Sequence, residues 1–213
     1  MALTILHLSD IHIRSDNDII LKHGDKIGSA CFRALPETTH LAILISGDIA
    51  YSGQQHQYDA AERLINEIRT KILTEKEIPI TIITTPGNHD CNFNNNSQPR
   101  QLLLEFLRNN SSTIPDKATI DTCTAVQNEF FKFRDSLEKE NNIQGDKLWR
   151  TTVIKTEEKQ IAIESLNLAW CSKLQEEPGN LIFPINSYEH IGSDSCEPPR
   201  VSRRLLHLRM EPR

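Results

Sequence analysis

Three short apolar segments, each followed at once by a polar cluster, constrain the fold of this chain more than any other feature. The segments are residues 3–8, 41–45 and 79–84, and the clusters after them are Asp10-Ile11-His12, Ser46-Gly47-Asp48 and Pro86-Gly87-Asn88-His89-Asp90. Short apolar runs rich in β-branched residues and bounded by turn residues are typical of buried strands. We therefore expect three strands, each ending in a loop that carries polar side chains.

The segment between the second and third strands predicts an amphipathic helix. Apolar residues recur there every three to four positions, which predicts a helix over residues 54–73. A weaker helical pattern over residues 19–35 is interrupted by Gly24 and Gly28. Alternation of strands and helices favours parallel βαβ units, whose ligands gather beyond the carboxyl ends of the strands. The predicted fold class is therefore α/β, with the polar clusters at one edge of one sheet.

The chain changes character after Cys91. Residues 92–97 are rich in asparagine and predict a loop, whereas residues 98–108 and 122–137 have helical patterns. We expect a helical insertion over residues 92–145 that covers or borders the site. Residues 148–155 and 160–166, separated by a polar turn, predict a hairpin that begins a second sheet.

The last segment has an unusual composition. No lysine occurs from residue 174 onward, although eleven precede it, and five of the thirteen arginines fall in the final fourteen residues. Two interpretations stay open: a solvated basic tail, or a segment that is not native to the domain because of truncation or a shifted reading frame.

Composition narrows the classes of function. The net charge of −5 argues against a large basic surface for long nucleic acids. No stretch approaches the roughly 20 apolar residues that cross a bilayer, and the amino terminus lacks a signal-peptide pattern. The five cysteines form no C-x-x-C pair, which fits reduced thiols. We expect a cytoplasmic protein with no membrane partner, and a buried Cys91 rather than a thiol near a metal.

The three polar clusters together predict a metal site. They contribute carboxylates, imidazoles and an amide to one sheet edge, which suit Mn²⁺, Fe or Zn²⁺. If Asp10 and His12 lie on an extended segment, their side chains share a face and can bind the same ion. Each cluster alone is also compatible with an ordinary turn or loop. Metal binding is favoured because the three clusters occur in this order and each directly follows an apolar strand.

The stretches TILHLSDIHI, LAILISGDIAYSG and ITIITTPGNHD resemble the first three motifs of the calcineurin-like metallophosphoesterases. The resemblance implies a four-layer α/β/β/α sandwich, incomplete here at the carboxyl terminus. Residues 1–170 would form the amino-terminal part of the phosphoesterase domain, and residues 171–213 an atypical tail. It also implies two divalent metal ions, Mn, Fe or Zn, as cofactors.

The same resemblance assigns roles to individual residues. Asp10 and His12 would bind the first metal, Asp48 would bridge both, and Asn88 would bind the second. His89 would be catalytic rather than a ligand, lying near the substrate as proton donor or charge stabiliser. Asp90 would orient that histidine.

This sequence departs from the family pattern in its second half. The family supplies further histidines from a later strand and from a Gly-His-x-His turn, and no such turn occurs here. His190 does not match, and His207 follows two leucines without a further strand pattern. The first metal would therefore lack one imidazole and the second would lack two. His7 is expected inside a strand. Three other histidines are expected at surface or helix positions: His23, His40 and His56.

The resemblance implies hydrolysis of a phosphomonoester or phosphodiester by a two-metal mechanism. The loop Gly47-Asp48-Ile49-Ala50-Tyr51-Ser52-Gly53 is most similar to the bacterial cyclic-AMP phosphodiesterase branch, which favours a phosphodiester as substrate, such as a cyclic nucleotide. One alternative is a metal-dependent DNA nuclease of the repair type, which the acidic composition disfavours. The other is a truncated, catalytically weak remnant, because ligands are missing. The oligomeric state stays open.

Overall fold

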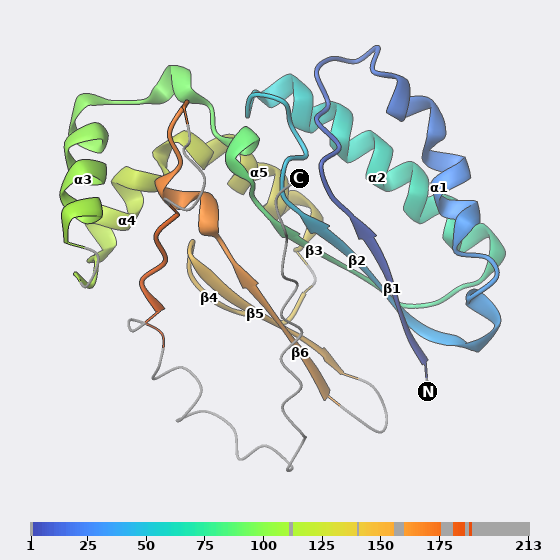
Figure 1. Cartoon of the computed structure of the whole chain (residues 1–213). Coiled ribbons are helices and arrows are strands. Elements are labelled where there is room, and N and C mark those ends of the chain that lie inside the picture. The colour runs from blue at the N-terminus through green and yellow to red at the C-terminus, as the bar shows by residue number, and fades with distance from the viewer. Residues whose placement is uncertain are drawn as a thin grey trace.

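A parallel sheet of three strands forms the centre of the amino-terminal half (Figure 1). The computed structural model describes residues 2–110, 113–139, 141–155, 160–175, 181–185 and 188. Strands β1 (Ala2–Leu8), β2 (Thr38–Ser46) and β3 (Ile80–Thr85) pair in that order, all in parallel. The three predicted strands are confirmed, and their carboxyl ends lie at one edge of the sheet.

Helices cover one face of this sheet. They are α1 (Gly24–Ala30), α2 (Gln55–Glu75) and α5 (Asn128–Leu137). Alternate residues of β2, including Leu41, Ile43 and Ile45, are buried in one core cluster with side chains from α2 and α5. Figure 1 shows α1 and α2 running side by side over the sheet. This core holds the strands in place and so fixes the loops at their carboxyl ends.

Two predicted helices have different bounds in the structure. The pattern over residues 19–35 divides into the 3-10 helices Ile19–His23 and Leu35–Glu37 with α1 between them. The pattern over 122–137 divides into the end of α4 (Lys117–Cys123), the 3-10 helix Thr124–Gln127 and α5. The remaining predictions, α2 and α3 (Gln98–Asn109), are confirmed within a residue or two.

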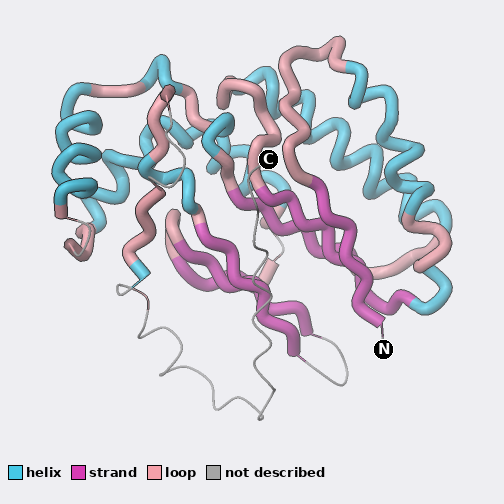
Figure 2. The backbone as a smooth tube through the Cα atoms, in the orientation of Figure 1, coloured by secondary structure: helices cyan, strands magenta, loops and turns pink. Residues whose placement is uncertain are grey.

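A second, antiparallel sheet lies next to the first (Figure 2). Its strands are β4 (Ile143–Gly145), β5 (Trp149–Lys155) and β6 (Gln160–Leu166), in that order. The predicted hairpin is therefore confirmed, although its turn at residues 156–159 lies outside the described residues. Strand β4 was not predicted, because three residues carry too little pattern. Mixed strands and helices with a parallel sheet bear out the α/β fold class.

One buried ion pair joins the two sheets. Glu138, at the end of α5, accepts hydrogen bonds on Oε1 from the backbone N and the Oγ1 of Thr84 in β3, both at 2.7 Å. Its Oε2 lies 2.7 Å from Nη1 of Arg150 in β5. The side chains of Glu138 and Arg150 are 2% and 14% exposed. One carboxylate therefore ties α5 to a strand of each sheet.

Helices α3 and α4 pack on a separate core cluster, together with Leu148 and Trp170. Arg100 of α3 is fully buried and donates to the carbonyl oxygens of Cys123, at 2.7 Å, and Ser172, at 2.8 Å.

No described helix combines the length and apolar character needed to cross a membrane. Most of the predicted tail, including His190 and His207, lies outside the described residues.

Candidate metal centre

The loops after β1 and β2 run side by side beyond the sheet. The backbone N of Asp10 donates to the carbonyl oxygen of Gly47 at 3.3 Å, and that of His12 donates to the carbonyl oxygen of Asp48 at 2.9 Å. Ile13 and Ala50 then form an isolated parallel bridge. The sheet pairing thus continues through the loops, and it places the first two polar clusters next to each other.

Asp10, His12 and Asp48 adopt left-handed backbone conformations. Their φ angles are 54°, 52° and 53°, and no other non-glycine residue of the described chain has a positive φ. The expectation that Asp10 and His12 lie on an extended segment is therefore wrong, because β1 ends at Leu8. Left-handed residues other than glycine cost about 1–2 kcal/mol each and concentrate at functional sites. Three predicted ligands share this strained geometry.

Three side chains from three loops converge at this edge. Nitrogen and carboxylate atoms of His12, Asp48 and His89 all lie within 4.8 Å of one another. The two imidazole rings meet edge to face, with centroids 4.6 Å apart. Asp10 lies on the same loop as His12 but is exposed and outside this cluster. Asn88 is exposed and directly precedes His89.

These residues fit a divalent cation. Nδ1 of His12 is buried and has no hydrogen-bond partner in the described structure. Buried polar atoms are nearly always satisfied, so an unpartnered nitrogen on an imidazole that lies beside a carboxylate and a second imidazole is an observation that fits a metal ligand. The imidazole of His12 and the carboxylate of Asp48 suit Mn²⁺, Fe or Zn²⁺. The imidazole of His89 lies beside them, close enough to bind the ion or to act on a substrate held there.

The loop after β3, which carries Gly87 and His89, is held against Asp48. Oδ1 of Asp48 accepts a hydrogen bond from the backbone N of His89 at 3.0 Å. A Cβ atom at position 87 would lie 2.1 Å from that same oxygen. Glycine is therefore required at position 87, because any side chain would displace the carboxylate.

Asp90 is the buried centre that joins the loops. Its carboxylate accepts from the backbone N of Gly87 at 2.9 Å, of Ala50 at 3.0 Å and of Ile49 at 3.4 Å. The hydroxyl of Tyr58 in α2 donates to it at 3.1 Å. Burial raises the pKa of Asp90 to about 6, although the hydrogen bonds from Gly87 and Ala50 oppose that rise. Asp90 therefore fixes the backbone of two site loops.

The imidazole of His89 is held by a different group. Its Nδ1 donates to the carbonyl oxygen of Tyr51 at 2.9 Å. Asp90, the residue expected to orient this histidine, holds the backbone of the surrounding loops. The Tyr51 ring lies 5.6 Å from the His89 ring, centroid to centroid, and the Arg14 guanidinium stacks 4.4 Å from the Tyr51 centroid. Sequence reasoning missed Tyr51 and Arg14; their positions just after two predicted ligand clusters were the available signal.

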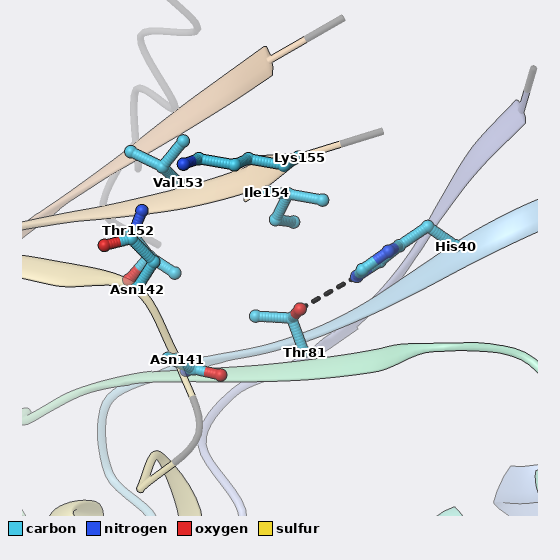
Figure 3. Close-up of a pocket in the computed structure, with 8 residues that line it drawn as sticks. All are labelled: His40, Thr81, Asn141, Asn142, Thr152, Val153, Ile154 and Lys155. Carbon is cyan, nitrogen blue, oxygen red and sulfur yellow. Dashed lines mark hydrogen bonds between the residues drawn. The ribbon is translucent and has the colours of Figure 1, made fainter. Parts of the chain in front are cut away.

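A cavity of about 400 Å³ adjoins Asn88 and His89. A separate cavity of about 360 Å³ lies between the two sheets, near the amino ends of β2 and β3 (Figure 3). Its lining contains none of the predicted site residues; His40 there is hydrogen-bonded to Thr81 at 2.8 Å. The first cavity is therefore the one associated with the candidate metal centre.

The other histidines of the described chain are not part of the His12–Asp48–His89 cluster. His7 is hydrogen-bonded to the hydroxyl of Ser46 at 2.6 Å. His40 lies in β2, not at the expected surface or helix position, and burial lowers its pKa. Cys91 is buried, as expected, and its thiol lies 3.8 Å from the carbonyl oxygen of Ala169.

Two comparisons with known proteins bear on this site. A family model described as calcineurin-like phosphoesterase matches residues 3–199. A search of curated proteins found no match. The matched range includes all three loops of the candidate centre.

Proposed function

The chain belongs to the calcineurin-like phosphoesterase family, and from that premise we propose that it hydrolyses a phosphodiester at the sheet edge with two divalent metal ions. The observation that carries the proposal is the convergence of His12, Asp48 and His89 within 4.8 Å. It is supported by the orphaned Nδ1 of His12 and by the left-handed backbone at the loop residues.

In this proposal, Asp10, His12 and Asp48 would hold one ion, and Asp48 and Asn88 would hold the second. When bound, the ions would supply an activated water and positive charge for the phosphoryl oxygens. Asp48 would be the shared ligand because its loop follows the middle strand β2, between the other two loops. Its hydrogen bond from His89 N fixes the direction of one carboxylate oxygen.

His89 acts on the leaving group. Because Nδ1 donates to the carbonyl of Tyr51, Nε2 is the nitrogen left to exchange a proton. In the imidazolium form, Nε2–H donates its proton to the ester oxygen as the P–O bond breaks, and water supplies the replacement oxygen on phosphorus. The cation of Arg14, stacked on Tyr51 beside His89, adds positive charge near the developing negative charge.

The proposed substrate class rests on the resemblance of the loop over residues 47–53 to the bacterial cyclic-AMP phosphodiesterase branch, which favours a phosphodiester such as a cyclic nucleotide. A DNA nuclease remains the runner-up, because it would use the same three loops. A metal-binding chain with little turnover is the other alternative, and the absence of a Gly-His-x-His turn favours it.

Hydrolysis of bis(4-nitrophenyl) phosphate tests the proposal. Purified protein should release nitrophenol only with Mn²⁺, Fe²⁺ or Zn²⁺ and lose this activity in a chelator. Asp48→Asn should abolish it, whereas the matched change Asp59→Asn on the exposed face of α2 should not. Hydrolysis that persists without metal, or in Asp48→Asn, would refute the proposal. Metal binding without turnover would favour the weak-remnant alternative.

A further inference from the structure

The cavity beside His89 has a distinctive lining. It includes two aromatic rings and four amide side chains: Tyr51, Phe93, Gln54, Asn88, Asn92 and Asn94. Among the described residues that line it there is no carboxylate. An anionic ester bound at the metal centre could therefore extend into this cavity without meeting a negative charge.

Aromatic faces combined with amides match one ligand chemistry in particular. Amides both donate and accept hydrogen bonds, which suits the mixed donor and acceptor edge of a heterocyclic base. Aromatic side chains stack on the flat face of any base. An acyl chain would offer no hydrogen bond to the exposed amide of Asn94. The lining therefore favours a planar heterocycle.

The segment that carries Phe93 and Asn94 is already ordered for this role. The backbone N of Asn92 donates to the carbonyl oxygen of Val126 at 2.7 Å, and Oδ1 of Asn92 accepts from the backbone N of Asn94 at 3.2 Å. The guanidinium of the buried Arg100 lies 5.9 Å from the Phe93 ring centroid. A preorganised ring loses little entropy when a ligand stacks on it.

We propose that this cavity is a base-binding subsite, in which Phe93 is the stacking platform and Asn94 the hydrogen-bonding residue that determines specificity. The inference rests on the proposed function, since the ester phosphate would lie at His12, Asp48 and His89. The substrate is then a nucleotide ester whose base lies against residues 92–94, next to the histidine that protonates the leaving oxygen. Asn94 is exposed, and its side-chain amide makes no hydrogen bond to the rest of the described chain.

The test compares two ligands that differ only by the base. Calorimetry with Mn²⁺ present should show that adenosine 5′-monophosphate binds more tightly than ribose 5-phosphate by about 5- to 150-fold, the range for stacking one base on an aromatic ring. Phe93→Ala and Phe93→Leu should both remove this preference, and Asn94→Ala should reduce it. The matched control Phe106→Ala changes a phenylalanine of α3 that is 51% exposed and lies outside the cavity, so it should leave the preference intact.

Phe93→Leu guards against a trivial loss of folding, because it keeps apolar volume and removes only the flat ring. Equal affinity for the two ligands, or a preference that survives in a folded Phe93→Leu protein, would overturn the subsite. Parallel assays with bis(4-nitrophenyl) phosphate separate the two ideas. Turnover without a base preference refutes the subsite alone, whereas a Phe93-dependent preference without turnover refutes the proposed hydrolysis and supports the subsite.

Discussion

Replacing Arg150 with methionine should destabilise the whole fold, because it leaves a buried carboxylate without its ion partner. Glu138 would keep the two hydrogen bonds from Thr84 but lose the guanidinium 2.7 Å from Oε2. Removing one partner of a buried pair typically costs about 3–5 kcal/mol. The remaining Thr84 donors place the expected loss at the lower end, about 3 kcal/mol. That is a large fraction of the stability of a domain of this size.

The same variant should show a pH dependence of defined sign. Burial already raises the folded-state pKa of Glu138, while the charge of Arg150 opposes the rise. Without Arg150 that pKa rises further. A carboxyl group whose pKa is higher in the folded protein than in the unfolded chain costs no stability below the ordinary pKa of a glutamate. The cost appears as pH rises through the folded-state pKa, because the buried group must then ionise. The loss of stability should therefore be largest near pH 8 and shrink towards about pH 5, as Glu138 takes up a proton.

Urea denaturation at several pH values measures both effects. The double variant Glu138→Gln/Arg150→Met removes both charges and should recover much of the lost stability. Arg63→Met is the matched control, since it breaks an exposed pair with Asp16 and should cost less than about 1 kcal/mol. This prediction would be refuted if Arg150→Met lost no more stability than this control, or if its loss of unfolding free energy were the same at pH 5 and pH 8. The buried pair would then not stabilise the contact between the sheets.

Three further predictions concern the site loops. Asp48→Asn should lower the bound metal, measured by elemental analysis, more than Asp10→Asn does; equal metal contents would argue against a bridging Asp48. His89→Ala should keep its metal while the rate of diester hydrolysis falls by about 10²–10⁴-fold, and loss of metal would instead make this histidine a ligand. Gly53→Ala should lower the denaturation midpoint, because φ is 62° and a Cβ atom would lie 2.6 Å from the backbone N of Asn92; an unchanged midpoint would show that this loop yields.

The sequence was sufficient for the parallel sheet and for the edge at which the polar loops gather, because apolar strands and the turn residues that end them leave strong local patterns. Residues 41–45 form a continuous apolar run, as a strand buried on both faces does, and the polar residues after them had to lie at its carboxyl end. The hairpin β5–β6 was predicted for the same reason. Strand β4 and the division of helix 19–35 were missed, because tertiary contacts rather than local propensity decide such short elements.

The finer geometry of the site could not be predicted, because it depends on contacts between distant segments. Nothing near Asp10 and His12 in the sequence indicates a left-handed backbone; the hydrogen bonds to the loop after β2 impose it. The hold on His89 comes likewise from a carbonyl at Tyr51, which any residue type would supply. A side-chain pattern carries no information about such a backbone acceptor.

The candidate metal centre is organised by groups outside the His12–Asp48–His89 cluster. Asp90 accepts three backbone N–H groups from the loops that hold Asp48 and His89, and Tyr58 connects the same carboxylate to α2. A strained backbone conformation persists only where contacts with the surrounding structure outweigh the local conformational preference of the residue. Because this network is complete among the described residues, the loops should keep their arrangement without metal. Metal binding then loses little ordering entropy at His12 and Asp48, as a preorganised centre requires.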